Sequence, residues 1–600
     1  MSIISQLQKS AIESLFTLFN GPFSEKDFQV NQTKSEFEGD YTIVLFSLVK
    51  SLKLSPDAIG NQLGNHLVQH YHDLFSAFNI IKGFLNLTLK DEYWTEFLRK
   101  NHLDTCYGKK EMNGKRVMVE YSSPNTNKPL HLGHLRNIFL GWSVAEILKA
   151  NGFEVVKTCM VNDRGIHICK SMIAWQLYAN GATPASTHTK GDHFVGEYYV
   201  KFNESYKNQV KELMAAGKRE EEAEKEAPLM KATHQMLQDW EAGKPEVIEL
   251  WKTMNGWVYE GFDITYKNIG ADFNSIYYES NTYLLGKNIV QQGLEKEVFF
   301  KKEDGSIWID LTAEGLDEKI VQRKDGTSVY ITQDIGLHLQ KYEEYKIDQS
   351  IYVIGNEQNY HMKVLQLICL RLGLPNAANI FHLSYGMVEL TSGKMKSREG
   401  TVVDADDIVD EMIDTAKLHT EELGKVKDFT AEELVELYRT IGLGATKYYL
   451  LRVDPKKTMV FNPEESIDFH GFTGPFVQYT HARIKSILRK LSQESTTNLQ
   501  QGLVDKPKTT NLLRLEKELI IQLEQFPSSI EQACTEYNPS VIANYVFSLA
   551  KTFNSFYTEH SIANAESEEK KLLRLQLATM TANVIKSAMQ LLGIAVPERM

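Results

Sequence analysis

The chain has 600 residues, of which 42% are hydrophobic and 24% charged, and its net charge at pH 7 is −12. This composition is typical of a globular protein with three or four domains. The acidic excess argues against a protein that coats nucleic acid or an anionic membrane by bulk charge.

The five cysteines are scattered and include no CxxC pair. We therefore expect neither a zinc site nor a disulfide framework, and we expect a reduced, cytoplasmic location. No apolar run reaches the 18 residues that a membrane-spanning helix needs, so no membrane partner is expected.

The N-terminal part predicts a small α+β domain over residues 1–108. Residues 1–20 place their apolar side chains on one face of a helix and lack the pattern of a signal peptide. Apolar runs lie on both sides of Gly83, and the polar segment 109–116 predicts a domain boundary.

Residues 117–163 contain the clearest structural pattern in the chain. A β-branched run at 117–123 predicts a buried strand, 135–151 a helix and 154–163 a second strand. Strand, helix and strand within about fifty residues form a βαβ unit, which requires a parallel sheet.

The sheet is expected to continue after a long interruption. Residues 171–300 are polar and helix-rich, and we interpret them as an insertion. Strands are predicted at 329–335, 350–355 and 379–390, with a helix at 357–373. The fold class is therefore α/β, with a Rossmann-like parallel-sheet domain over 109–408 that carries this helix-rich insertion.

Only helical patterns follow residue 410. They predict a helical connector over 409–470 and an all-α C-terminal domain over 471–600. Helices are expected near 431–451, 475–491, 510–525, 540–557 and 567–592, with a loop at 496–510.

Two short motifs flank the predicted sheet. HLGH (131–134) lies between the first strand and its helix, where unpaired backbone N–H groups favour anions. GKMKSREGTVV (393–403) follows the last strand and is a basic loop of the kind that stabilises charge on phosphates. Each motif alone is weak, but together they indicate a nucleotide site at the carboxyl ends of the strands.

The paired HxGH and KMxS motifs resemble those of class I aminoacyl-tRNA synthetases, and the chain more narrowly resembles arginyl-tRNA synthetase. The stretches that carry this likeness are EYSSPNTNKPLHLGHLRN (120–137), VNDRGIHICKSM (161–172), SVYITQDI (328–335), GNEQNYH (355–361), TGPFVQYTHAR (473–483) and LLGIAVPERM (591–600). The likeness extends from about residue 80 to the last residue. It implies that the C-terminal all-α domain binds the anticodon.

The resemblance implies an L-arginine pocket. Ser123, Asn125 and Gln358 would hold the α-amino and carboxylate groups of the substrate. Asp334 and Glu279 would face its guanidinium, since carboxylates accept paired hydrogen bonds from that group. The remaining residues expected at this pocket are Tyr330, Glu120 and His134. Such a pocket needs no editing domain, so no hydrolytic role is assigned to 171–300.

The resemblance also implies an ATP site. ATP would lie across His131, Gly133 and His134 and the backbone of Gly386, Met387 and Val388. Mg²⁺ would accompany the triphosphate, held by phosphates and water rather than by a protein cage. The basic loop would supply Lys394, Lys396 and Ser397.

One departure from the family pattern concerns that loop. It reads Lys394-Met395-Lys396-Ser397-Arg398, so the fourth-position lysine of the family motif is replaced by Ser397. Lys396 or Arg398 would substitute, or Lys128 would supply the charge from beside HLGH. We favour Lys128 for the α-phosphate.

Contacts with tRNA are expected at both ends of the chain. Residues 471–600 contain 14 Lys and Arg and 12 Asp and Glu, so they are relatively basic within an acidic protein. This small excess favours recognition by stacking and base-edge bonds. The residues singled out are Tyr479, Phe553, Tyr557 and Met600 for the anticodon and Asn86 for the outer corner of tRNA.

The leading function is an arginine–tRNA ligase that acts as a monomer on L-arginine, ATP and tRNA. Another class I synthetase would lack the pairing of Asp334 with Glu279, and a nucleotidylyltransferase would have no use for the helical tail. A catalytically dead binding module stays open because of the altered KMKSR sequence. The need for tRNA during activation follows from the resemblance alone.

Overall fold

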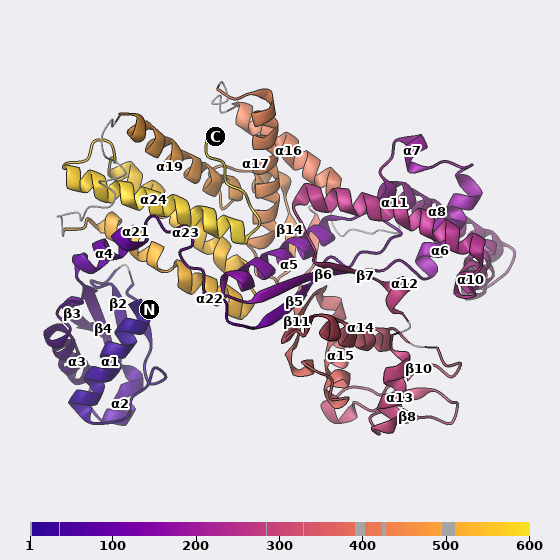
Figure 1. The fold of residues 1–600 in the computed structure, drawn as a ribbon, viewed down its shortest axis with the longest axis horizontal. Coiled ribbons are helices and arrows are strands. Elements are labelled where there is room, and N and C mark those ends of the chain that lie inside the picture. Colours follow the sequence, from indigo (N-terminus) through magenta and orange to yellow (C-terminus); the bar gives the residue numbers. More distant parts are fainter. Residues whose placement is uncertain are drawn as a thin grey trace.

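A five-stranded parallel sheet lies at the centre of the computed structural model, which describes residues 3–34, 36–283, 285–327, 329–390, 403–422, 428–494 and 511–600 (Figure 1). The strand order is β12-β11-β5-β6-β7. The strands are β5 (Arg116–Glu120), β6 (Glu154–Val161), β7 (Ser275–Tyr278), β11 (Gln349–Gly355) and β12 (Ile380–Tyr385). Their carboxyl ends therefore meet at one edge, where ligands of open α/β sheets bind.

The predicted βαβ unit is confirmed. Helix α5 (Leu132–Ala150) connects β5 to β6, and the two strands pair in parallel. Most of α5 is buried, because it lies between the sheet and the C-terminal helices. A Cβ on Gly141 would lie 2.4 Å from Cβ of Tyr121, so glycine permits the close approach of helix to sheet.

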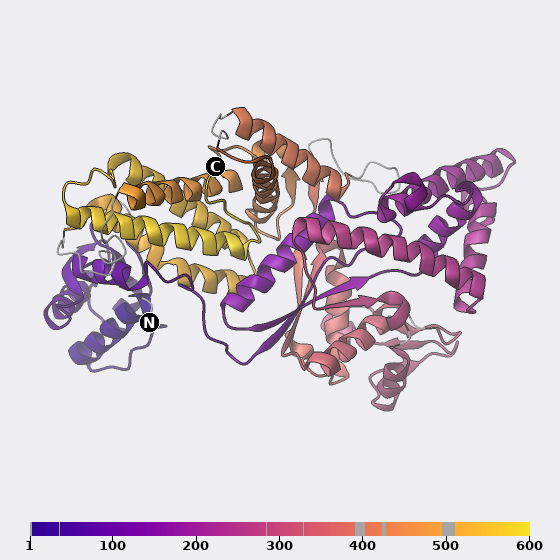
Figure 2. The same cartoon turned by 45° about the horizontal axis from the view of Figure 1, so that its top comes forward.

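The predicted helix-rich segment follows β6. Its helices form an arm at one end of the molecule (Figure 2). They are α6 (Ile166–Tyr178), α7 (Pro184–Thr187), α8 (Gly191–Ala215), α9 (Glu220–Glu226), α10 (Pro228–Glu241) and α11 (Pro245–Ile269). The chain then returns to the main sheet as β7, which pairs with β6. Residues 171–300 thus include an edge strand that the sequence pattern did not reveal.

A second hydrophobic core is formed by residues between Ile289 and Ile380. It contains the antiparallel sheet β10-β9-β8 and the helices around it. The elements are α12 (Glu279–Thr282), α13 (Lys287–Glu295), β8 (Phe300–Lys301), β9 (Ile307–Ile309), β10 (Lys319–Gln322), α14 (Tyr330–Tyr345) and α15 (Asn359–Arg371). Helix α15 confirms the helix predicted at 357–373.

The strand predicted at 329–335 is wrong, because these residues begin helix α14. Their β-branched content favours a strand locally. Ile331 and Ile335, however, are both buried and are four residues apart, which places them on one face of a helix. Tertiary burial of that face overrides the local preference.

The strand predicted at 379–390 is two strands. The chain leaves the main sheet after β12 and continues as β13 (Val388–Leu390). Strand β13 pairs in parallel with β14 (Met459–Phe461) from the helical part of the chain. A Cβ on Gly386 would lie 2.6 Å from the backbone of Lys457 and Thr458, so this residue allows the crossing.

The N-terminal domain contains a four-stranded antiparallel sheet with helices against it. The helix predicted over 1–20 is confirmed as α1, and the runs around Gly83 form the β3–β4 hairpin. The elements are α1 (Ile3–Phe19), β1 (Val30–Gln32), β2 (Tyr41–Val44), α2 (Phe46–Leu52), α3 (Pro56–His70), β3 (Phe75–Ile81), β4 (Phe84–Leu89) and α4 (Asp91–Asn101).

The C-terminal part is a bundle that also contacts the N-terminal domain. Its elements are α16 (Ala405–Glu422), α17 (Ala431–Leu451), α18 (Pro463–Ser466), α19 (Gly474–Glu494), α21 (Arg514–Glu524), α22 (Phe526–Glu536), α23 (Ser540–Glu559) and α24 (Glu568–Leu591). The five predicted helices are confirmed, whereas α22 and the strand β14 within the predicted helical connector were not foreseen. The loop predicted at 496–510 lies outside the described residues. Glu524 accepts a hydrogen bond of 3.0 Å from the N–H of Ile3.

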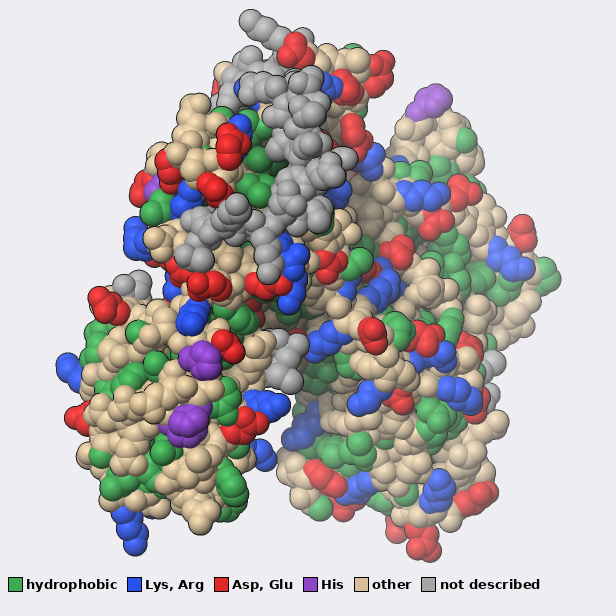
Figure 3. Space-filling model, turned by 60° about the vertical axis from the view of Figure 1, so that its left-hand side comes forward, with side chains coloured by type: hydrophobic (Ala, Val, Ile, Leu, Met, Phe, Trp, Pro, Cys, Tyr) green, Lys and Arg blue, Asp and Glu red, His purple; other side chains and the backbone are tan. Residues whose placement is uncertain are grey.

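The N-terminal domain stands out as a separate lobe. Apart from its contacts with the C-terminal bundle, a hollow lies between it and the neighbouring part of the molecule, with Lys and Arg side chains along that hollow (Figure 3). None of the described helices is both long and apolar enough to cross a membrane.

Candidate functional site

The HLGH turn holds two histidines in one defined protonation state. Nδ1 of His131 accepts a hydrogen bond of 3.1 Å from the N–H of Gly133, and Nδ1 of His134 accepts one of 3.1 Å from the N–H of His131. A ring nitrogen that accepts carries no proton, so each imidazole has its proton on Nε2. Burial lowers the pKa of both rings, that of His131 to about 3.

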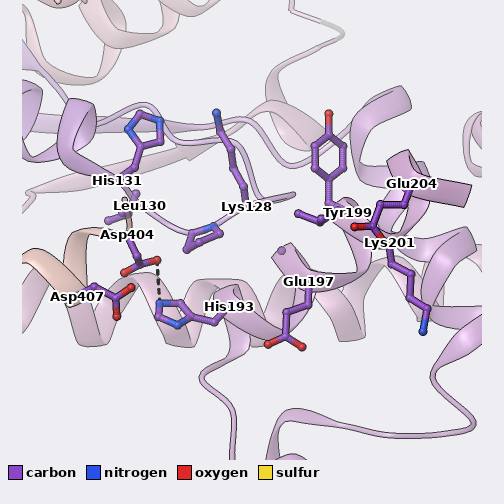
Figure 4. A pocket seen from close by; sticks show the side chains of 13 residues that line it. Lys128, Leu130, His131, His193, Glu197, Tyr199, Lys201, Glu204, Asp404 and Asp407 are labelled. Atoms are coloured by element: carbon purple, nitrogen blue, oxygen red, sulfur yellow. Dashed lines mark ion pairs between the residues drawn. The ribbon is translucent and has the colours of Figure 1, made fainter. Parts of the chain in front are cut away.

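Both rings are therefore neutral at pH 7 and each retains one Nε2–H donor. They lie at the N-terminus of α5, whose first backbone N–H groups also favour an anion. Lys128 extends to the same side as His131, and its charge adds to the lowering of the histidine pKa (Figure 4). Two neutral donors, an ammonium and a helix N-terminus together suit a polyphosphate.

Gly386, Met387 and Val388 lie across from this turn and are tied to α5. The buried guanidinium of Arg136 donates to the carbonyl of Met387 (2.9 Å) and to that of Lys457 (2.7 Å). The N–H of Gly386 donates to the carbonyl of Pro455. Arg136 lies within the stretch 120–137, but the sequence did not indicate this role for it. Lys394, Lys396 and Ser397 lie outside the described residues.

Ser122 and Ser123 adopt a strained backbone directly after β5. Their φ angles are 79° and 45°, which non-glycine residues rarely adopt. Asn137 holds this turn, because its Oδ1 accepts from the N–H of Ser122 (2.5 Å) and its Nδ2 donates to the carbonyl of Val353 (2.7 Å). This turn places Ser123 and the exposed Asn125 at the edge of the sheet where the strands have their carboxyl ends.

The predicted carboxylate pair comes from two separate elements. Asp334 lies one turn after Tyr330 on α14, and Glu279 begins α12 directly after β7. Burial raises the pKa of Glu279 to about 7, and the negative charges of Asp163 and Asp334 add to this effect while Arg164 opposes it. Burial also raises the pKa of Asp334. Two carboxyls held in an unfavourable environment suit a cationic ligand.

Sequence reasoning missed His361 beside this pair. Its Nε2 donates to Oδ2 of Asp334 over 2.7 Å, and its ring lies 5.4 Å from that of Tyr330. Tyr330 is 55% exposed, so its ring remains available on the open side. His361 is the last residue of the family-like stretch GNEQNYH (355–361), and this position was the one sequence feature that pointed to it. Gln358 is exposed in the turn that precedes α15.

Glu120 is near this pocket but is already paired. It is 6% exposed and forms a buried ion pair with Lys341 of α14. The rings of Tyr277 and Tyr352 also face the ammonium of Lys341. A carboxylate neutralised in this way does not offer a free charge to a ligand. Lys341 was not foreseen.

The residues predicted to contact tRNA have very different surroundings. The prediction that Phe553 contacts the anticodon is corrected, because its ring is fully buried in the bundle and is not available to a base. Asn86 is 1% exposed and bonds to Thr42 (2.6 Å) and Asn79 (2.8 Å) at the floor of a surface pocket. Tyr557 lies under the guanidinium of Arg483. The other two, Tyr479 and Met600, are half-buried.

One cluster has the spacing of a metal site. Ligand atoms of Asp192, His193 and Asp406 lie within 4.8 Å of one another. The ammonium of Lys190 lies 2.6 Å from Asp406 and 3.1 Å from Asp192, so a cation already fills this position.

Three family models together match most of the chain. Residues 2–89 match the arginyl tRNA synthetase N-terminal domain, 95–462 the catalytic domain of class I (R) tRNA synthetases, and 477–600 the DALR anticodon-binding domain. Similar curated proteins are named arginine–tRNA ligase. Those of Flavobacterium psychrophilum and Bacteroides fragilis are each 52% identical, with 100% of both chains covered.

Solved structures give the same fold. The arginyl-tRNA synthetase of Thermus thermophilus matches with a TM-score of 0.77 at 23% identity, over 100% of both chains. That of Plasmodium falciparum matches with a TM-score of 0.76 at 18% identity, over 100% of this chain and 99% of the other.

Proposed function

The chain belongs to the arginyl-tRNA synthetase family, and from that premise we propose how its residues ligate arginine to tRNA. The enzyme is an arginine–tRNA ligase. L-Arginine reacts with ATP to give arginyl-adenylate and pyrophosphate, and the arginyl group then passes to the 3′-terminal ribose of the cognate tRNA.

The observation that best supports this function is that two kinds of group lie at one edge of the sheet: donors suited to an anion and carboxyls suited to a cation. Neutral histidine donors and Lys128 lie after β5, while the carboxyls of Glu279 and Asp334 lie after β7 and on α14. An amino acid with a cationic side chain and a nucleotide polyanion match these two halves. Among amino acids, arginine presents the planar fork of donors that two carboxylates bind best.

In the amino-acid half, Glu279 and Asp334 bind the guanidinium and His361 orients Asp334. Tyr330 covers the open side of the guanidinium. The α-amino and carboxylate groups are held by Ser123, Asn125 and Gln358. The substrate carboxylate is ionised at pH 7 and attacks the α-phosphorus directly, so no general base is required.

In the nucleotide half, the Nε2–H groups of His131 and His134 donate to phosphate oxygens, and Lys128 neutralises the α-phosphate. Gly133 and the backbone of Gly386, Met387 and Val388 face the adenosine. Lys394, Lys396 and Ser397 are proposed to contact the leaving pyrophosphate. Catalysis then consists of positioning and charge stabilisation, because the transfer needs little covalent chemistry from the protein.

Mg²⁺ is proposed to arrive with ATP. The donor set around HLGH consists of N–H groups and an ammonium, which fits a metal held by phosphate oxygens and water better than one held by carboxylates. Bound there, the ion would neutralise charge on the leaving pyrophosphate.

The four-part division at 108, 408 and 470 is also proposed in functional terms. The N-terminal domain would contact the outer corner of tRNA near Asn86, and the C-terminal bundle would read the anticodon near Tyr479, Tyr557 and Met600. The basic hollow beside the N-terminal lobe supports an RNA path between them (Figure 3). We infer a monomer that works in the cytoplasm, where its five free thiols and its substrates are compatible.

Charging of tRNA with labelled amino acids tests this function. The protein should esterify arginine onto arginine-specific tRNA and should not charge lysine or glutamine. Asp334→Asn should reduce kcat/KM for arginine by at least about 100-fold, because it removes the charge opposite the guanidinium. Lys302→Met, far from the site in the β8–β9 hairpin, is the control and should charge normally. Charging of lysine at a comparable rate would contradict the proposed pocket.

A further inference from the structure

A cluster of charged side chains lies beside the HLGH turn, and two of its members, His193 and Asp404, line the same pocket as His131 and Lys128. Lys190, Asp192 and His193 come from the start of α8, and Asp404 and Asp406 come from the start of α16. Figure 4 shows His193 and Asp404 with the ion pair between them. The cluster connects the helical arm to the ATP-binding turn. None of its members is assigned to substrate binding above.

Asp404 is the centre of this connection. Its segment pairs with the HLGH turn through two backbone hydrogen bonds, from Leu132 to Val403 (3.4 Å) and from Ala405 to Leu130 (3.0 Å). Its Oδ1 accepts from the N–H of Asp406 (2.8 Å) at the start of α16. Its Oδ2 lies 3.1 Å from Nε2 of His193. The side chain of Asp404 therefore joins the helix start to the ion pair, and the backbone on either side of it is bonded to the turn.

Asp406 adds a second connection. Its Oδ2 lies 2.6 Å from the ammonium of Lys190 and 3.3 Å from His193, and its Oδ1 accepts from Thr265 of α11 over 3.0 Å. Lys190 also donates to Thr265 (2.6 Å) and Asp192 (3.1 Å). Two helices of the arm thus bind one carboxylate.

These pairs are poorly screened by solvent. The side chains of His193, Asp404, Asp406 and Lys190 are 29%, 13%, 21% and 17% exposed. The carboxylates of Asp404 and Asp406, which lie 3.1 Å and 3.3 Å from Nε2 of His193, raise the pKa of His193 to about 10, so the imidazolium persists at pH 7. Removal of one partner leaves a partly buried charge uncompensated, which favours rearrangement of the segment that carries it.

We propose that His193 and Lys190 are positioning residues for the ATP-binding turn. They hold residues 403–406 against Leu130–Leu132 and thereby fix the direction in which His131 and Lys128 point. This inference rests on the proposed binding of ATP at HLGH. It gives the first turn of α8 a role in the reaction. Small misplacements of catalytic groups slow a reaction strongly, so ion pairs that hold this turn in place should affect the rate of arginine activation.

The test is the kinetics of His193→Ala, measured by arginine-dependent ATP–pyrophosphate exchange with saturating tRNA. We expect kcat/KM for ATP to fall at least about tenfold, while KM for arginine stays within about twofold of wild type. His193→Lys keeps a cation at this position and should recover most of the loss. The matched control is His234→Ala, an exposed histidine on α10, which should leave all constants unchanged.

A second variant keeps the test decisive if His193→Ala is unstable. Asp404→Asn retains an oxygen to accept from Asp406 but removes the charge opposite His193, so it should give the same selective loss for ATP. The double variant should lose little more than either single one, because both break the same pair.

The inference is overturned if folded His193→Ala and Asp404→Asn keep wild-type kinetics toward ATP. It is also overturned if KM for arginine rises as much as KM for ATP, since this would indicate general damage to the catalytic domain. An inactive wild-type protein would instead refute the proposed function.

Discussion

The protonation of Glu279 should control the affinity for arginine near neutral pH. Burial raises the pKa of this carboxyl to about 7, and only its ionised form attracts a guanidinium. With that pKa, about half of the free enzyme is ionised at pH 7 and about one eleventh at pH 6. The expected result is a decrease of about fivefold in kcat/KM for arginine between pH 7 and pH 6.

Steady-state aminoacylation between pH 6 and 8, with saturating ATP and tRNA, measures this profile. kcat/KM reports the pKa values of the free enzyme, which is the state in which Glu279 lacks its cationic partner. Glu279→Gln carries no titrating group and should show a lower and nearly flat profile for arginine. The profile for ATP in the same buffers gives the pH effects that arise elsewhere.

A wild-type profile as flat as that of Glu279→Gln would refute the reasoning. It would mean either that Glu279 is ionised throughout this range or that it does not face the guanidinium. A slope that persists in Glu279→Gln would assign the titration to another group, with His361 beside Asp334 as the first to examine.

Three further predictions concern the turn and the buried charges. His131→Asn keeps an oxygen to accept from the N–H of Gly133 but loses the Nε2–H donor, so exchange activity should fall about 100-fold with little change in thermal stability. Burial raises the pKa of Glu524 to about 7, so the folded protein holds this proton more tightly than the unfolded chain. As the pH rises from 4.5 to 7.5, this group should therefore lower the free energy of unfolding by up to about 3 kcal/mol. Glu524→Gln should abolish this pH dependence in unfolding experiments. Glu516→Ala removes the carboxylate that the buried cations of Lys570 and Arg574 share and should destabilise the bundle by about 3–5 kcal/mol, measured by denaturant unfolding.

The βαβ unit and the two halves of the candidate site could be predicted from the sequence, because they depend on local patterns. The HLGH turn follows β5 as predicted, and its histidines both face one helix terminus. The strand predicted at 329–335 failed because β-branched residues lie on the buried face of helix α14. Strand β7 was missed because it is short and follows a long helical arm.

The residues that pair with the predicted site residues were the hardest to predict from the sequence. Lys341 is more than 200 positions from Glu120, and His193 is equally remote from Asp404, so no local pattern connects them. Phe553 was named as a stacking platform because an aromatic residue on a helix has the same appearance in sequence whether it faces RNA or a core. Only the packing of α23 against the bundle distinguishes the two.

Arginine-dependent ATP–pyrophosphate exchange, with and without arginine-specific tRNA, tests the central claim most directly. The account predicts exchange that requires arginine, is not supported by lysine, and is abolished by replacing both His131 and His134 with alanine. Exchange in the absence of tRNA would leave the assignment as a ligase unchanged and would show only that arginine activation does not need tRNA. A folded protein with no exchange in either condition would contradict the assigned site and leave a binding module in its place.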